Sequence, residues 1–379
     1  MKYLSLIFFI VFIIKANAQQ AFHNMGNIKI HENGQIGFHT NLINDGIFNQ
    51  NLGLAGFYNQ NNSLSISGTS ITRFFNFEVA VDDNLFLDIN TEITNNLNFI
   101  IGHVVTPRDN TNISLDFLND AFNALESNNR NTDGYSSYTG NDLFKFPIGD
   151  DDKLRPLITP AQTTNPKFSA AYFNEDPNFP STFNNNFSTD ISEEIIKKVS
   201  INEFWDFNGD AQTQVTLTWN QESAISDLIE SLDNLRVVGW SLDENRWVDL
   251  GNFETTGNIN TGTITSFPFI PNNFEIITFG SLIGSDGLTV YNLFSPNDDN
   301  NNDSFVIEGV DLFENTLKVY NRWGNLVYET FNYKNDWKGI ANVKNILKKG
   351  EKLPAATYFY VLELPTENKN YTGWLYINY

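Results

Sequence analysis

The sequence predicts an all-β protein, and three observations lead to this prediction. Short apolar runs rich in β-branched and aromatic residues are separated by Asn-Gly and Asn-Asn pairs typical of turns. Hydrophobic residues make up 41% of the chain and aromatic residues 14%, which is enough for folded cores. Asparagine, about one residue in seven, favours turns and tolerates left-handed backbone. We therefore expect an N-terminal solenoid-like or sandwich β region, a middle β-sandwich and a small C-terminal Ig-like β-sandwich.

The composition excludes several classes of function. The chain has 23 Lys+Arg against 45 Asp+Glu, a formal net charge of -22, whereas a nucleic-acid partner requires a basic surface. There is no cysteine, so disulfides, thiolate metal sites and cysteine nucleophiles are absent. Four histidines argue against a histidine-based zinc or catalytic site.

The N-terminus has the three parts of a secretory signal peptide. Lys2 supplies positive charge, an apolar run extends from Leu4 to Ile14, and Ala16-Asn17-Ala18 is a small-residue cleavage motif. A run of about 11 apolar residues is too short for a membrane-spanning helix, which needs ~20. We predict a signal peptide over residues 1–18, cleavage between Ala18 and Gln19, and no transmembrane segment after its removal.

Residues 19–139 are predicted to form a β-rich, solenoid-like region. Strand-like runs recur every ~8–12 residues without intervening helices, which fits either a stacked solenoid or a sandwich. Alternation is clear where Leu85, Leu87 and Ile89 share one face of a strand. The solenoid is favoured because the repeats are imperfect and no single period fits.

Residues 140–283 are predicted to form a separate β-sandwich domain. The polar stretch from Ser127 to Asn141 marks the boundary. Within the domain, Val215, Leu217 and Trp219 alternate with polar neighbours, as in a half-buried antiparallel strand. One short helix is expected within Ser223 to Asp233.

No catalytic motif is recognised in these two regions. Asp206 and Asp210 flank Asn208-Gly209, which we interpret as a turn rather than a pair of catalytic carboxylates. The tryptophans are interpreted as core residues rather than sugar-stacking platforms; they are Trp205, Trp219, Trp240 and Trp247. A cleft that holds two carboxylates would instead indicate an enzyme, and a flat aromatic platform would indicate sugar binding.

Residues 284–379 differ from the rest of the chain. From residue 286 they contain nine Lys+Arg and twelve Asp+Glu, so most of the acidity lies earlier in the sequence. Leu317–Tyr320 and Leu326–Glu329 flank a turn rich in Asn and Gly, which predicts a hairpin. About seven short strands are expected, the size of a small Ig-like sandwich.

Several motifs in this region occur in the order of a known family. They are Leu293-Phe294-Ser295-Pro296-Asn297, Asn302-Asp303, Asn321-Arg322-Trp323-Gly324-Asn325, Trp337-Lys338-Gly339, Leu353-Pro354, Thr357-Tyr358-Phe359-Tyr360 and Gly373-Trp374-Leu375-Tyr376-Ile377. The region resembles the gliding-motility-associated C-terminal domain, the type B sorting domain of the Bacteroidota type IX secretion system. The resemblance implies export through the periplasm, recognition by the type IX translocon, and arrival at the outer cell surface or in the medium.

This sequence departs from the family pattern at three points. Asp298-Asp299-Asn300 replaces Gly-Asp-Gly, Trp337-Lys338-Gly339 replaces Trp-Asp-Gly, and Ala356 replaces a glycine before Thr357. The segment from Lys344 to Lys352 is a longer, lysine-bearing loop. The hydrophobic pattern is retained, so we expect the family fold.

Candidate recognition residues lie in two of these motifs. Arg322 offers a rigid fork of donors and Trp323 a large amphipathic ring, and both residue types are enriched in interface hot spots. The alternative is that Trp323 packs on the core and Arg322 pairs locally with an acid. The full set of candidate sorting or recognition residues is Asn321, Arg322, Trp323, Gly324, Gly373, Trp374 and Tyr376.

Calcium is the one cofactor that the spacing suggests. Oxygen-bearing side chains stand at every second position from residue 297, and a glutamate follows at the twelfth, as in a calcium loop. The alternative is a simple Asn/Asp turn before a strand. The candidate ligands are Asn297, Asp299, Asn301, Asp303 and Glu308.

Together these observations predict a secreted or cell-surface protein exported by its C-terminal sorting domain. We expect the cargo, residues ~19–283, to be adhesive or structural and non-enzymatic, with a cell-surface or glycan ligand as its partner. The alternative is a secreted polysaccharide-binding protein or hydrolase with the same export signal.

Overall fold

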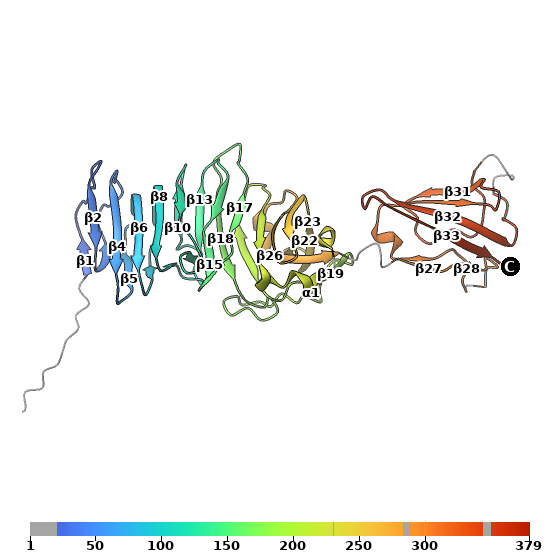
Figure 1. Ribbon diagram of the computed structural model, residues 1–379, viewed down its shortest axis with the longest axis horizontal. Helices are drawn as coiled ribbons and strands as arrows, with labels where there is room; N and C mark the ends of the chain where they lie inside the picture. The colour runs from blue at the N-terminus through green and yellow to red at the C-terminus, as the bar shows by residue number, and fades with distance from the viewer. Residues whose placement is uncertain (1–20, 230, 283–287, 300, 344–349) are drawn as a thin grey trace, which may run out of the picture. The chain divides into compact units, whose positions relative to one another are not determined.

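The structure is a computed structural model that describes residues 21–229, 231–282, 288–299, 301–343 and 350–379 (Figure 1). It divides into two compact units. Unit 1 contains residues 1–192 and 198–280, and unit 2 contains residues 193–197 and 281–379. The predicted signal peptide and its cleavage site between Ala18 and Gln19 lie outside the described residues.

The all-β prediction is confirmed. Among the described residues the only α-helix is α1 (Ile225–Leu228), within the segment where a short helix was expected. The other helical turns are the 3-10 segments η1 (Gln221–Ser223), η2 (Leu232–Asn234), η3 (Pro271–Asn273) and η5 (Val310–Leu312). These helices are all short, and none in the described part of the chain has the length and hydrophobicity that a bilayer crossing needs.

The first part of unit 1 is a β-solenoid, as the sequence favoured. Successive strands alternate between two sheets and pair in parallel with the strand one coil earlier. Gln35 of β2 lies opposite Leu54 of β4, which lies opposite Asn76 of β6, so one coil takes about 20 residues. Figure 1 shows these coils stacked side by side. The strands of the first sheet, in spatial order, are β1 (Ala21–Asn24), β3 (Asn41–Asn44), β5 (Leu64–Gly68), β7 (Leu85–Leu87), β9 (Val104–Val105), β12 (Thr132–Asp133), β15 (Ile148–Asp150) and β16 (Lys153–Leu154).

Stacked phenylalanines and buried asparagines hold the coils together. Phe38 and Phe57 of neighbouring coils stack with their ring centroids 4.8 Å apart. At the turns, Asn24 donates from Nδ2 to Oδ1 of Asn44 at 2.7 Å, and Asn44 donates to the carbonyl of Ser70 at 2.9 Å. Some of the many asparagines therefore form an internal hydrogen-bond ladder, because amide side chains both donate and accept.

The second sheet of unit 1 changes from parallel to antiparallel pairing at β13. This strand pairs in parallel with β10 and antiparallel with β18. The strands of this sheet are β2 (Gln35–Phe38), β4 (Leu54–Asn59), β6 (Thr72–Val81), β8 (Thr91–Ile101), β10 (Leu115–Leu118), β13 (Ser136–Thr139), β18 (Lys167–Phe173), β20 (Phe204–Asn208), β26 (Phe274–Leu282), β22 (Leu235–Ser241) and β23 (Arg246–Gly251), with β11 (Phe122–Ala124) and β19 (Ile196–Val199) off this path.

The expected boundary at residues 139 and 140 coincides with this change of pairing. It lies inside unit 1, where one hydrophobic core runs from Ile30 in the solenoid to Phe279 in the antiparallel part. A further antiparallel sheet packs over the antiparallel part of unit 1. Its strands are β14 (Phe144–Phe146), β17 (Leu157–Thr159), β21 (Thr216–Trp219), β25 (Thr261–Thr265) and β24 (Glu254–Asn258). The core continues across the change of pairing because solenoid strands and antiparallel strands belong to the same sheet.

Unit 2 is built on a five-stranded sheet and a two-stranded sheet. Its core is formed by apolar side chains from the inner face of the large sheet and from the segments that connect the strands. This core includes Phe294, Phe305 and Trp337. The large sheet consists, in order, of β28 (Leu293–Phe294), β33 (Lys369–Ile377), β32 (Ala356–Leu364), β30 (Thr316–Tyr320) and β31 (Leu326–Phe331), and the small one of β27 (Thr289–Val290) and β29 (Ile307–Glu308). The expected hairpin is present as β30 and β31.

Candidate functional site

The Asn-Arg-Trp-Gly-Asn motif forms the turn between β30 and β31. Asn321 is buried, and its Oδ1 accepts the backbone N–H groups of Trp323 and Asn325 at 3.0 Å each. Gly324 has a φ of +78°, a left-handed conformation that glycine adopts without strain. Asn321 and Gly324 therefore shape the turn, and the turn exposes the two residues between them.

Arg322 and Trp323 are the presented residues. Trp323 is 74% exposed, so it does not pack in the core. The Arg322 guanidinium lies 5.1 Å from the centroid of its ring, a cation–π contact that orders both side chains. Beside them is a hollow of about 170 Å³, lined also by Leu353, Pro354 and Tyr358. Two motifs about 30 residues apart in the sequence thus form one surface feature.

The outer face of the same sheet carries exposed aromatic side chains. Cross-strand register places Tyr320 of β30 opposite Phe359 of β32, and Phe359 opposite Trp374 of β33. Tyr376 of β33 lies opposite Leu293 of β28. Phe359 is 48% and Trp374 52% exposed. We call Leu293, Tyr320, Phe359, Trp374 and Tyr376 the aromatic face; it adjoins the Arg322–Trp323 turn, because Tyr320 directly precedes Asn321.

Gly373 has a different role from its neighbours. A Cβ atom at this position would lie 2.6 Å from the hydroxyl oxygen of Tyr360, which packs against it. Gly373 therefore permits close packing within the domain.

One family model matches the chain, over residues 288–377, and it describes the CHU_C type IX secretion signal domain. This part of the chain is similar to type IX secretion signal domains, and residues 288–377 are called the signal domain below. No curated protein and no solved structure matches the chain. The match contains the turn, the hollow beside it and the aromatic face.

Two departures of this signal domain from the family pattern lie together in space. Asp298, where the pattern has glycine, pairs with Lys338, where the pattern has an acid, at 3.1 Å. The Lys338 ammonium holds the pKa of Asp298 below its usual range, mainly through their hydrogen bond. The two substitutions are therefore complementary in charge. Ala356 begins strand β32 and is not among the described residues with positive φ.

Four of the five calcium candidates of the signal domain lie in one loop, and the fifth, Glu308, lies on a strand. Asn297 and Asp299 accept backbone N–H groups of their own loop, from Asp299 and Asn301, and Asp303 accepts from the N–H of Asp298 at 2.8 Å. Glu308 lies on β29 and accepts from the hydroxyl of Tyr291 at 3.0 Å. Among the described residues, no group of three or more His, Asp or Glu side chains has an arrangement that could hold a metal.

Calcium binding by this loop stays a prediction. If calcium binds only the folded protein, it must raise the melting temperature of the full chain relative to the same protein in chelator. Asp299→Asn should abolish the shift, and Asp311→Asn, at an exposed acid outside the loop, should retain it. Equal melting temperatures with calcium and with chelator would refute the prediction.

Unit 1 holds a separate pocket of about 410 Å³ that is open to solvent. Six segments of the chain line it: the loop at Arg108, the segment at Tyr135, the loop at Phe183, the end of β20, Leu242 after β22, and the start of β26 with the residues before it. Its size is within the range of roughly 300–1,000 Å³ that is usual for small-ligand sites.

Asp206 forms the polar floor of this pocket. Its carboxylate is buried and accepts from the Tyr135 hydroxyl at 2.5 Å and from Nδ2 of Asn208 at 2.6 Å. Burial raises the pKa of Asp206 to about 6, although both hydrogen bonds act in the opposite direction. The nearby charge of Glu275 acts on this pKa in the same direction as burial. The pocket therefore contains two neighbouring carboxylates in different environments.

Sequence reasoning missed this site. It interpreted Asp206 as part of a turn, whereas Asp206 lies within β20, between the buried residues Trp205 and Phe207. A polar residue inside an apolar strand was the available signal, but its partners Tyr135 and Glu275 could be found only from the fold. The four tryptophans interpreted as core residues, Trp205, Trp219, Trp240 and Trp247, are all buried.

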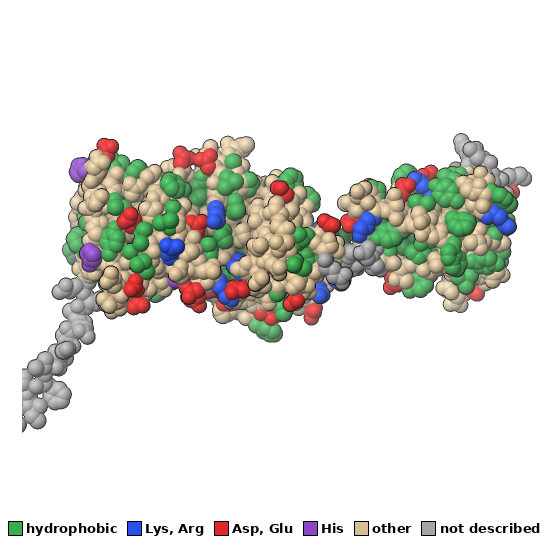
Figure 2. All heavy atoms as spheres, in the orientation of Figure 1, with side chains coloured by type: hydrophobic (Ala, Val, Ile, Leu, Met, Phe, Trp, Pro, Cys, Tyr) green, Lys and Arg blue, Asp and Glu red, His purple; other side chains and the backbone are tan. Residues whose placement is uncertain are grey.

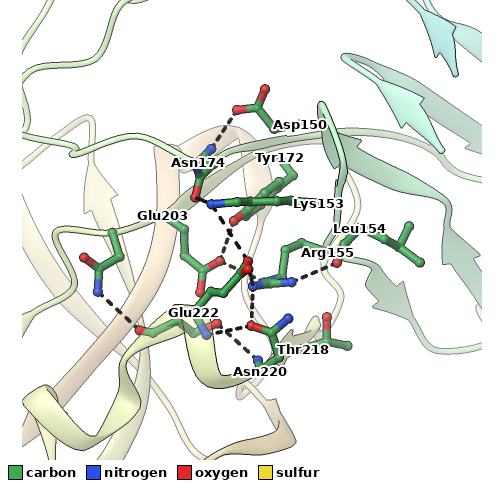
Figure 3. A network of polar contacts seen from close by, with 12 residues as sticks. Asp150, Lys153, Leu154, Arg155, Tyr172, Asn174, Glu203, Thr218, Asn220 and Glu222 are labelled. Carbon is green, nitrogen blue, oxygen red and sulfur yellow. Dashed lines mark hydrogen bonds and ion pairs between the residues drawn. The ribbon is translucent and has the colours of Figure 1, made fainter. Parts of the chain in front are cut away.

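A buried ion pair lies elsewhere in unit 1 (Figure 3). Arg155 donates from Nε to Oε2 of Glu203 at 3.0 Å, and their side chains are 4% and 2% exposed. Tyr172 donates to the same oxygen at 2.6 Å, and Asn220 accepts from the guanidinium. Glu222, 57% exposed, lies at the rim of this network, 3.5 Å from the guanidinium. Neither the pocket around Asp206 nor the hollow beside Trp323 is lined by a member of this network, and we assign it to stability.

Proposed function

We propose that the chain is a secreted or cell-surface protein, exported by type IX secretion through its C-terminal signal domain. The match of residues 288–377 to the signal domain carries this proposal. The apolar N-terminal run and the Ala16-Asn17-Ala18 motif supply the expected route through the inner membrane and the periplasm.

We propose that unit 1 is the cargo and that its role is adhesive or structural. A stack of solenoid coils presents a long surface, and its strands are hydrogen-bonded to neighbouring strands. Such a surface on a regular backbone is suited to a binding scaffold. Acidic side chains are scattered over its visible face rather than gathered in one patch (Figure 2). This distribution fits an exposed, soluble scaffold better than a surface that binds anionic polymers.

The test of the export proposal is the location of two forms of the protein. The full chain and a chain that ends at residue 285 are expressed in a host with a working type IX system. The full chain should reach the surface or medium, where external protease digests it, and the shortened chain should remain in the periplasm. Export of both forms would show that the C-terminal domain is not the signal.

A second function, polysaccharide binding or hydrolysis, is favoured by one specific observation. Besides the exposed Asp109, the pocket of unit 1 holds the carboxylates of Asp206 and Glu275, together with aromatic side chains. A cleft that holds two carboxylates was the feature expected of an enzyme, and a flat aromatic platform was the feature expected of sugar binding.

For the signal domain, we propose that the secretion machinery recognises the aromatic face and the Arg322–Trp323 turn. Exposed tryptophan, tyrosine and arginine side chains are the residues most often found at the centre of protein interfaces. In this domain they adjoin on one sheet, and the fold leaves them exposed.

A further inference from the structure

We propose that the pocket around Asp206 and Glu275 binds an uncharged saccharide. This inference rests on the proposed function of a surface protein and names the class of its ligand. It is argued from the charges, the hydrogen-bonding groups and the apolar wall of the pocket.

The charges of the pocket exclude anionic ligands. Asp109, Asp206 and Glu275 line it, and Arg108 is the cation among its described lining residues. The guanidinium of Arg108 is largely engaged by the protein: it donates to Asp133 at 2.6 Å and to the carbonyls of Tyr172 and Gly149. Asp150 lies 3.1 Å away as a second counter-ion. An acidic sugar or a phosphate would thus face three carboxylates and a cation whose charge is already paired within the protein.

The two carboxylates can accept hydrogen bonds from a ligand. Asp206 is oriented by Tyr135 and Asn208, and each of its oxygens retains a further acceptor position. Within the described part of the chain, the side chain of Glu275 makes no hydrogen bond or ion pair, although it is partly buried on the pocket wall. A partly desolvated carboxylate without a partner gains most from a ligand that donates hydrogen bonds, such as a row of sugar hydroxyls.

The remaining wall favours a saccharide over a simple cation. Phe183 and Phe274 give the pocket apolar surface that can cover the C–H face of a sugar ring. Phe183 is held in place by edge contacts with Phe204 and Phe187. The amide of Asn208 and the hydroxyl of Thr182 both donate and accept, which matches sugar hydroxyls that do the same. A cation would make no use of the apolar wall.

The test uses the purified full chain and titration calorimetry with neutral gluco-, manno-, galacto- and xylo-oligosaccharides and N-acetylated chito-oligosaccharides. Oligouronates and deacetylated chitosan oligosaccharides serve as anionic and cationic references. We expect at least one neutral oligosaccharide to bind, and Glu275→Ala to weaken its binding at least about tenfold, because a charged hydrogen-bond acceptor is lost. Glu254→Ala, at an exposed glutamate on β24, should bind as the unmodified protein does.

A second variant separates loss of binding from loss of folding. Asp206→Asn retains the shape of the side chain and should also weaken binding, while circular dichroism confirms the β fold. If the protein hydrolyses a bound neutral oligosaccharide, and Glu275→Ala abolishes this hydrolysis, the result would equally support the site. The inference is overturned if no neutral oligosaccharide binds, if only the cationic reference binds, or if both pocket variants bind normally. These outcomes are independent of where the protein is exported, so failure here leaves the export proposal intact.

Discussion

Replacing Phe359 and Trp374 together by threonine should reduce secretion of the full chain sharply and leave the protein in the periplasm. The two side chains are opposite each other on β32 and β33, and about half of each is exposed. Loss of two such aromatic anchors costs at least about 2 kcal/mol of binding free energy at a typical interface, which corresponds to roughly a 30-fold loss of affinity. The measurement is the fraction of protein at the surface and in the medium.

Two controls make this result specific. Threonine is a good strand former, so the sheet of the signal domain should fold, and resistance of the purified variant to protease checks this. Phe253→Thr removes a phenylalanine of unit 1 that is 62% exposed, and it should be exported normally. Normal export of the double variant would show that the machinery reads another surface, and Arg322→Ala with Trp323→Ala would then test the turn alone.

Glu203→Ala should lower the free energy of unfolding of unit 1 by about 3–5 kcal/mol. The substitution removes the carboxylate that accepts from Arg155 and Tyr172, and it leaves the Arg155 guanidinium buried without its counter-ion. Urea denaturation of the full chain, followed by tryptophan fluorescence, measures the loss. Trp205 is a suitable reporter, since its Nε1 donates to the carbonyl of Arg155.

Glu222→Ala is the matched control for this prediction. Glu222 approaches the same guanidinium, but its side chain is 57% exposed and water screens the pair. Its removal should cost less than about 1 kcal/mol. The free energy of unfolding of unit 2, measured in the same experiment, should not change in either variant. A similar cost for both substitutions would mean that burial does not distinguish the two carboxylates.

Much of unit 1 could be predicted from local sequence, because its strands are short and pair with strands that are close to them in the sequence. Leu85 and Leu87 are buried on β7, as their alternation indicated, and the Asn-rich segments form turns and ladders between coils. In a parallel solenoid each strand pairs with the chain about one coil away, so periodic spacing carries information on the tertiary arrangement. The solenoid was favoured over the sandwich because the repeats are imperfect and no single period fits, while the sharing of one core with the antiparallel part was not foreseen.

The signal domain was recognisable from sequence because its motifs occur in fixed order, and the family match covers residues 288–377. The exposure of Trp323 was left open, since a tryptophan beside a turn can fold inward or outward. The hydrogen bonds of Asn321 decide it: they close the turn locally and leave Arg322 and Trp323 directed to solvent. Gly373 was grouped with Trp374 as a candidate recognition residue, which stays a prediction; the structure adds that the ring of Tyr360 packs closely against this position.

The sequence by itself determined the all-β class, the solenoid-like start and the export signal, because each depends on residues that are near neighbours or on an ordered set of motifs. Only the tertiary structure decided the pocket of unit 1, because Arg108, Tyr135, Asp206 and Glu275 come from separate strands and loops. The same is true of the Arg155–Glu203 pair, whose members are 48 residues apart. Burial and charge proximity are properties of the folded chain, so no local pattern could have distinguished these carboxylates from the many that solvent surrounds.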